Sequence, residues 1–110
     1  MTFRITTTPR VRAPVRLSIE IDGAIEEHEF GATFRILPVS RTSEEAMRSD
    51  DGQVAFLTDA IAGFDDLVDD DGQPTPFTPQ LVAALLDRVD VRPALLKAYF
   101  EAAQKAAAGN

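Results

Sequence analysis

The sequence contains no cysteine and no tryptophan, and His28 is its single histidine. Without cysteine the chain cannot form a disulfide, a thiolate nucleophile or a cysteine-ligated zinc site, and a reducing compartment is the expected setting. No apolar run approaches the roughly 20 residues that a membrane span requires. Because no apolar run follows the charged first dozen residues either, we expect no signal peptide and no membrane partner.

Motifs of known catalytic sites are also missing. The six glycines are isolated from one another, so none of them builds a glycine-rich phosphate-binding loop. Ser18, Ser40, Ser43 and Ser49 lie in no strand–turn–helix nucleophile motif. We therefore predict a protein that catalyses nothing, uses no cofactor and works by binding another protein.

Apolar residues make up 45% of the 110 residues, enough for one buried core, and the charge is unevenly distributed. Residues 1–48 hold seven arginines and seven acidic residues, whereas residues 49–110 hold eleven acidic residues and four basic ones. The net charge of −7 therefore comes from the second half and would repel a phosphate backbone, so nucleic acid is not an expected partner. This acidic half either keeps the surface solvated or complements a basic partner.

Two strands joined in a hairpin are predicted in the first third of the chain. Apolar and polar residues alternate over residues 15–22 and again over residues 30–36, which gives each strand one apolar face. Asp22-Gly23 favours a tight turn between them. Gly31 suggests a bulge or a bend in the second strand, which Pro38 ends.

About four helices are predicted after the hairpin. Thr42 and Glu45 have the spacing of a capping box for a short first helix, which residues 49–52 interrupt. A second helix then runs to Gly63, with Ile61 on its apolar face. Residues 64–77 form an acidic loop or small hairpin.

The last two helices have clearer start signals. Thr78-Pro79 begins the third helix, because threonine caps and proline loses no hydrogen bond there, and Phe77 can pack on Val82. Asp90 is expected to cap the fourth helix, and residues 106–110 to fray. The predicted apolar face of the fourth helix consists of Leu95, Leu96, Tyr99, Phe100 and Ala103.

Strands followed by helices indicate an α+β fold, in which helices pack on one face of a small N-terminal antiparallel hairpin or sheet. Residues 1–14 are either a flexible arm or an edge strand, and residues 15–110 form a single domain.

Two polar features deserve a test as metal sites. His28 stands between Glu27 and Glu29, but neighbours in a strand point to opposite faces, so these side chains cannot converge. The acidic run at residues 65–72 does not fit a calcium loop, because aligning Gly72 with the sixth position puts a leucine at the first. We predict no metal, with His28 exposed and the acidic run forming a turn.

Six large apolar residues in the second half of the chain are more than a chain of this size is expected to bury. Part of this set is expected to be core, and part to be a patch that binds a partner. The candidate partner-binding residues are Phe64, Leu67, Val68, Phe77, Tyr99 and Phe100.

From about Val15 to its end, the chain resembles the tail assembly chaperones of long-tailed bacteriophages and prophages. The order and spacing of several short segments carry the resemblance. These segments are Phe34-Arg35-Ile36-Leu37, Ser43-Glu44-Glu45, Phe56-Leu57, Ile61-Ala62-Gly63-Phe64, Leu67-Val68-Asp69-Asp70-Asp71-Gly72, Pro76-Phe77-Thr78-Pro79-Gln80-Leu81, Leu85-Leu86, Val91-Arg92-Pro93-Ala94-Leu95 and Ala98-Tyr99-Phe100-Glu101-Ala102.

The resemblance implies a protein of the bacterial host cytoplasm that binds the long helical tape-measure protein, keeps it soluble and helps recruit tail-tube protein. It implies absence from the mature virion, self-association and, in many members, a longer form made by translational frameshifting. Two alternatives remain open. The chain could be a structural minor tail component, such as a connector or tube-terminating subunit, or a generic protein–protein adaptor.

Overall fold

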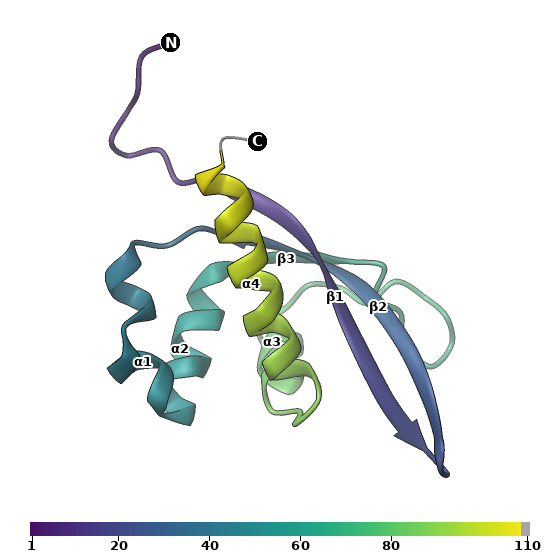
Figure 1. Ribbon diagram of the computed structural model, residues 1–110. Helices are drawn as coiled ribbons and strands as arrows, with labels where there is room; N and C mark the ends of the chain where they lie inside the picture. Colours follow the sequence, from purple (N-terminus) through teal and green to yellow (C-terminus); the bar gives the residue numbers. More distant parts are fainter. Residues whose placement is uncertain (109–110) are drawn as a thin grey trace.

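The computed structural model describes residues 1–108, which contain a three-stranded antiparallel sheet of order β1-β2-β3 and four α-helices. The helices gather on one side of a long hairpin (Figure 1), which is the predicted α+β arrangement. In chain order the elements are β1 (Arg10–Ile21), β2 (Ala24–Arg35), a 3₁₀ turn (Val39–Thr42), α1 (Glu44–Arg48), α2 (Asp50–Ala60), β3 (Ile61–Asp65), α3 (Pro79–Leu86) and α4 (Val91–Ala107).

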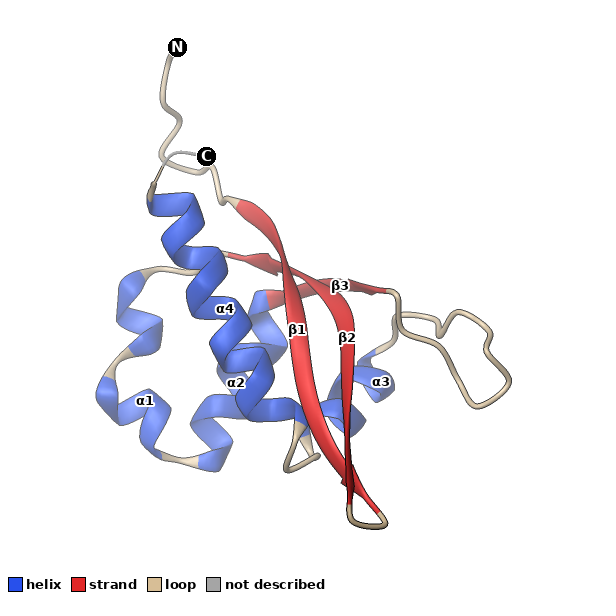
Figure 2. Ribbon diagram, turned by 45° about the vertical axis from the view of Figure 1, so that its right-hand side comes forward, coloured by secondary structure: helices blue, strands red, loops and turns tan. Residues whose placement is uncertain are grey.

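The predicted hairpin is confirmed. β1 and β2 pair without interruption from Arg10↔Arg35 to Ile21↔Ala24. Asp22 and Gly23 have φ values of 53° and 83°, as a two-residue type I′ turn requires. The tip of the hairpin extends past the helices (Figure 2), so its apolar residues are less covered than those nearer the core.

The first strand begins earlier than predicted. β1 starts at Arg10, five residues before Val15, so residues 10–14 are the edge strand and only residues 1–9 remain as an arm. Pro14 fits inside this strand because β1 lies at the edge of the sheet, where one side of the strand needs no donor for a ladder.

The third strand, β3, is a correction to the prediction, which had placed Ile61 in a helix and ended that helix at Gly63. The helix α2 ends at Ala60, and Ile61 pairs with Phe34 of β2. The bulge expected at Gly31 is also displaced, because the irregularity in the ladder lies between Thr33 and Phe34.

The start of the first helix differs from the predicted capping box. Ser43, not Thr42, caps α1, and its Oγ accepts a hydrogen bond from the Ala46 N–H at 3.2 Å. The Thr42 hydroxyl instead donates to the Val39 carbonyl at 3.0 Å, which closes the preceding 3₁₀ turn. Ser49 both ends α1 and caps α2.

The predicted start of α3 is confirmed, because Thr78 Oγ1 accepts from the Leu81 N–H at 3.1 Å and Pro79 is in the first turn. Asp90 does precede α4, but its side chain makes no cap hydrogen bond. It accepts two hydrogen bonds from Arg88 instead, at 2.9 and 2.8 Å. Of the tail expected to fray, residues 106–107 are helical, and 109–110 lie outside the described residues.

The core forms where α4 and α2 pack against the sheet. The helix α4 lies along β1 (Figure 2), and its small residues allow this close approach. No polar or charged residue is buried anywhere in residues 1–108. The largest buried side chains are Tyr99, Phe34, Phe56, Leu57, Leu86, Leu95 and Val15.

An ion pair crosses the solvent-facing side of the sheet. Arg12 of β1 donates to both carboxylate oxygens of Asp65 in β3, at 2.8 and 2.9 Å, above the intervening strand. A Cβ at Gly31 would overlap both charged groups. Gly31 is therefore glycine because the pair passes directly over it, rather than because a bulge needs it.

We expect this pair to make stability depend on pH. The hydrogen bonds from Arg12 lower the pKa of Asp65 below its usual value, although partial burial opposes the shift. A carboxyl group whose pKa falls on folding stabilises the fold above its unfolded pKa of about 3.9 and loses that contribution as pH falls through the folded pKa. Asp65→Asn should therefore lower the melting temperature slightly at pH 7 and have no effect near pH 2.

The matched control is Asp66→Asn, because Asp66 is 3.7 Å from Arg12 and more exposed. Melting temperatures should be measured for both variants from pH 7 to pH 2. The role of the pair would be contradicted if Asp65→Asn and Asp66→Asn lowered the melting temperature equally, or if the effect of Asp65→Asn grew as pH fell.

Candidate binding grooves at the two ends of α4

Two open apolar grooves lie near opposite ends of α4. The first, here called the α4 groove, has a volume of about 380 Å³ and lies between the end of α4 and the segment that follows β2. None of its lining residues is charged. They are Pro9, Ile36, Leu37, Val39, Thr42, Tyr99, Phe100, Ala103, Ala106 and Ala107.

The α4 groove exists because small and large side chains face each other across it. Ala103 and Ala106 leave space on the helix. The Leu37 N–H donates to Tyr99 Oη at 3.1 Å and so fixes the facing segment to the helix. This hydrogen bond therefore fixes the position of one wall relative to the other.

The second groove, here called the hairpin groove, has a volume of about 340 Å³ and lies between the hairpin, the loop after β3 and the helices α3 and α4. Its centre is apolar and charged groups stand at its margin. Its lining residues are Leu17, Ile19, His28, Glu29, Phe30, Asp66, Leu67, Val68, Leu85, Arg88 and Val91.

Two cations near the hairpin groove, Arg88 and Arg16, are paired with carboxylates. Arg88 binds Asp90 through two hydrogen bonds, and these hydrogen bonds lower the pKa of Asp90. Arg16 binds Glu29 at 3.1 Å. Asp69, Asp70 and Asp71 directly follow Val68 in the sequence but do not line the groove. Among the residues that line the groove, two acidic ones, Glu29 and Asp66, stand against one basic one, Arg88.

The six candidate partner-binding residues do not form one patch. Leu67 and Val68 line the hairpin groove, whereas Phe100 lines the α4 groove. Tyr99 also contacts the α4 groove, but it is only 2% exposed and belongs to the core. Phe100, Phe77 and Val68 are 42%, 46% and 58% exposed.

Phe64 and Phe77 support the hairpin groove without lining it. The ring of Phe64 packs edge-on against Phe30 at 5.7 Å and against Phe77 at 5.4 Å between centroids. Phe30 is buried and lines the groove. This row of three rings therefore connects the acidic loop to the sheet.

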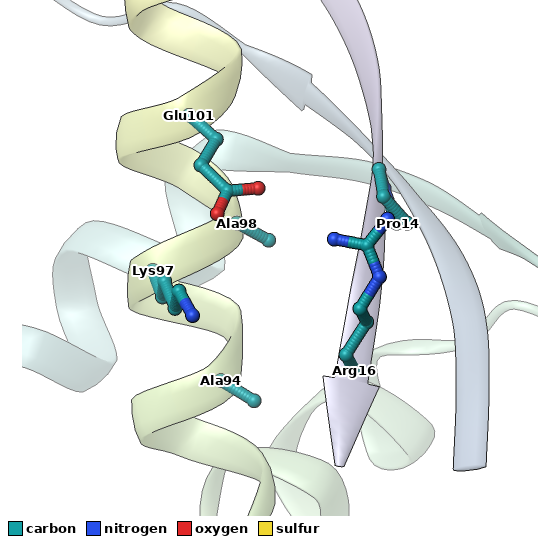
Figure 3. A pocket seen from close by; sticks show the side chains of 6 residues that line it. All are labelled: Pro14, Arg16, Ala94, Lys97, Ala98 and Glu101. Carbon is teal, nitrogen blue, oxygen red and sulfur yellow. The ribbon is translucent and has the colours of Figure 1, made fainter. Parts of the chain in front are cut away.

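A third hollow, between α4 and β1, is too small to bind a ligand. Figure 3 shows Ala94 and Ala98 pointing from α4 toward Pro14 and Arg16 on β1, with Lys97 and Glu101 at the side. The hollow measures about 30 Å³, which is room for about one water molecule.

The acidic run forms a small hairpin around a turn, which confirms one of the two predicted arrangements. Val68 and Pro74 make an isolated bridge. Asp69 Oδ1 accepts from the N–H groups of Asp71 and Gln73 at 2.9 and 3.0 Å. This carboxylate therefore caps the turn, a role that the sequence analysis missed.

His28 and the acidic residues do not assemble a metal site. His28 Nε2 lies 3.1 Å from Glu26 Oε1, because residues two apart share one face of a strand. Residues 1–108 hold no group of three histidine, aspartate or glutamate side chains placed to bind a metal ion. Over the same residues, every helix is too short or too polar to cross a membrane.

Similarity to other proteins gives no help in interpreting the two grooves. Compared with protein-family models, with curated proteins and with solved structures, the chain matches none.

Proposed function

We propose that this protein is a tail assembly chaperone that binds a tape-measure protein and works without turnover. In this proposal it acts in the bacterial host cytoplasm, keeps the tape measure soluble, assists the addition of tail-tube protein and is absent from the mature virion. The observation that carries the proposal is the α4 groove, an open apolar surface with no charged lining residue.

The shape of the α4 groove suits a helical partner. Ala103, Ala106 and Ala107 form a wall of small side chains, which lets the backbone of another helix come close. Val39 and Phe100 are large, exposed and placed to contact the apolar face of such a helix. A long apolar helix would bury its side chains here, while the acidic second half of the chain keeps the complex in solution.

Co-expression with the tape-measure protein of the same phage or prophage tests this proposal. We expect most of the tape measure to stay soluble and to co-purify with this chain, and to be insoluble when expressed alone. Repeating the experiment with a longer frameshifted form, if one is made, controls for a required extension. An insoluble tape measure in both cases would contradict the proposal.

A further measurement separates a chaperone from a structural tail component. Mass spectrometry of purified virions should detect tail-tube protein and no peptide of this chain. Its recovery in particles at a fixed ratio to tube protein would favour the connector or tube-terminating alternative.

A further inference from the structure

Exposed apolar side chains are concentrated at one end of the molecule. Ten large apolar residues are exposed in residues 1–108, and five of them belong to the arm at residues 1–9 or to the α4 groove. These five are Met1, Phe3, Ile5, Val39 and Phe100. The arm and the groove therefore both present apolar surface to water, and each would lose that exposure by packing on the other.

The arm joins the body at the wall of the α4 groove. Pro9 lines the groove, and its carbonyl accepts a hydrogen bond from the N–H of Ile36, a second lining residue, at 2.9 Å. Figures 1 and 2 show the arm leaving the body beside the C-terminal end of α4, which forms the facing wall. Residues 1–8 line neither groove, so the structure shows the arm in an open position.

We propose that the arm folds back over the α4 groove of its own chain, with Phe3 and Ile5 packed on the apolar lining. Side chains two residues apart in an extended segment share one face, so Arg4 between them points to solvent. The contact is apolar on both sides and needs no ion pair, which suits a groove with no charged lining residue.

The arm is long enough to cover the groove. Ile5 and Phe3 lie four and six residues before Pro9, so their Cα atoms reach at most about 14 and 21 Å from it. The lining of α4 extends from Tyr99 to Ala107, which is about 12 Å of helix. Both side chains therefore reach the helical wall without stretching the arm fully.

The hairpin groove is a poorer fit for the arm. Phe30, the residue of that groove nearest to Pro9 along the hairpin, pairs with Val15, which lies about 20 Å along the strand from Pro9. Of the two apolar residues, only Phe3 has a Cα that reaches so far, and only when the arm is fully extended. The α4 groove closes a shorter loop, which costs less conformational entropy.

A closed arm shields the α4 groove from other apolar surfaces. A helix that binds this groove has to displace Phe3 and Ile5, so its apparent affinity falls in proportion to the fraction of open molecules. This competition rests on the proposed function, whereas the docking of the arm does not.

Phe3→Trp in the full chain reports the position of the arm, because the sequence contains no tryptophan. We expect its emission at a shorter wavelength than that of free tryptophan in water, and at the same wavelength at every protein concentration, since the contact lies within one chain. Adding Phe100→Asp should shift the emission to longer wavelength, because the charge resists burial under the arm. Adding Val68→Asp, a matched change in the hairpin groove, should leave the emission unchanged.

Three results would overturn the docking. They are an emission of Phe3→Trp equal to that of free tryptophan, a wavelength that changes with protein concentration, and a shift caused by Val68→Asp instead of Phe100→Asp. Circular dichroism of each variant verifies that the helices persist.

The competition has its own test with the tape-measure protein. Phe3→Asp/Ile5→Asp should bind the tape measure more tightly than the unsubstituted chain, because the groove stays open. Thr2→Asp/Thr6→Asp adds the same charge to exposed positions of the arm and should not tighten binding. Equal affinity of the first variant and the unsubstituted chain would overturn the competition, whereas a tape measure that binds neither would contradict the proposed function.

Discussion

Replacing Tyr99 with alanine should lower the free energy of unfolding by about 3–5 kcal/mol, the largest loss of stability that we expect from one substitution. Its ring packs edge-on against Phe34 at 5.6 Å and against Phe56 at 4.7 Å between centroids. Alanine would leave a cavity where α4, α2 and the sheet meet. A domain of this size is stable by roughly 5–15 kcal/mol, so thermal unfolding should begin at least about 10 °C earlier.

Tyr99→Phe separates the ring from the hydroxyl group. It keeps the aromatic contacts and removes the acceptor for the Leu37 N–H, so we expect a smaller loss of about 1 kcal/mol. Urea unfolding of both variants, with Phe100→Ala as a surface comparison, measures these differences. A loss for Tyr99→Ala no larger than that for Phe100→Ala would contradict the placement of Tyr99 in the core.

Much of the fold could be predicted because its signals are local. The alternation in β1 and β2, the Asp22-Gly23 turn and the Thr78-Pro79 helix start each depend on a few neighbouring residues, and all three agree with the structure. Short-range hydrogen bonds and side-chain periodicity determine such features, so they can be recognised in one sequence.

Features that depend on distant contacts were missed. The strand β3 has five residues, and its apolar segment is compatible with either the end of a helix or a short strand. Its pairing with Phe34 decides between them. The Arg12–Asp65 pair joins residues 53 positions apart, and Gly31 gave the only sequence signal near it.

For a related reason, the sequence could not divide the candidate binding residues between the core and the surface. Helix α4 carries large apolar residues on adjacent faces, and the sequence alone does not show which face the sheet covers. The structure buries Leu95, Ala98 and Tyr99 and leaves Phe100 exposed. Of the six candidate residues, of which some were expected to be core, the structure buries Tyr99 and places Leu67 and Val68 in one groove and Phe100 in the other.

Phe100→Asp should abolish most of the binding to the tape measure, the largest functional effect that the proposed function implies. The carboxylate would replace an apolar side chain in the lining of an uncharged groove and would lose solvation when a partner helix covers it. A change of this kind at the centre of an interface costs about 2 kcal/mol or more, which is roughly a 30-fold loss of affinity. Because Phe100 is partly exposed, the fold itself should persist.

The matched control is Val89→Asp. Val89 is 94% exposed, lies between α3 and α4 and lines neither groove. The same charge is thus added to the same chain outside the proposed interface. Melting curves should show Val89→Asp within about 0.5 kcal/mol of the unsubstituted protein. Phe100→Asp should be folded but about 1 kcal/mol less stable, because the Phe100 ring packs edge-on against Tyr99 at 5.5 Å between centroids.

The most direct test is the fraction of tape-measure protein that stays soluble when it is co-expressed with each variant. Our account predicts a soluble, co-purifying tape measure with Val89→Asp and an insoluble one with Phe100→Asp. A tape measure that stays soluble with Phe100→Asp would contradict the account. So would loss of solubility with Val68→Asp alone, because that result would place the partner in the hairpin groove.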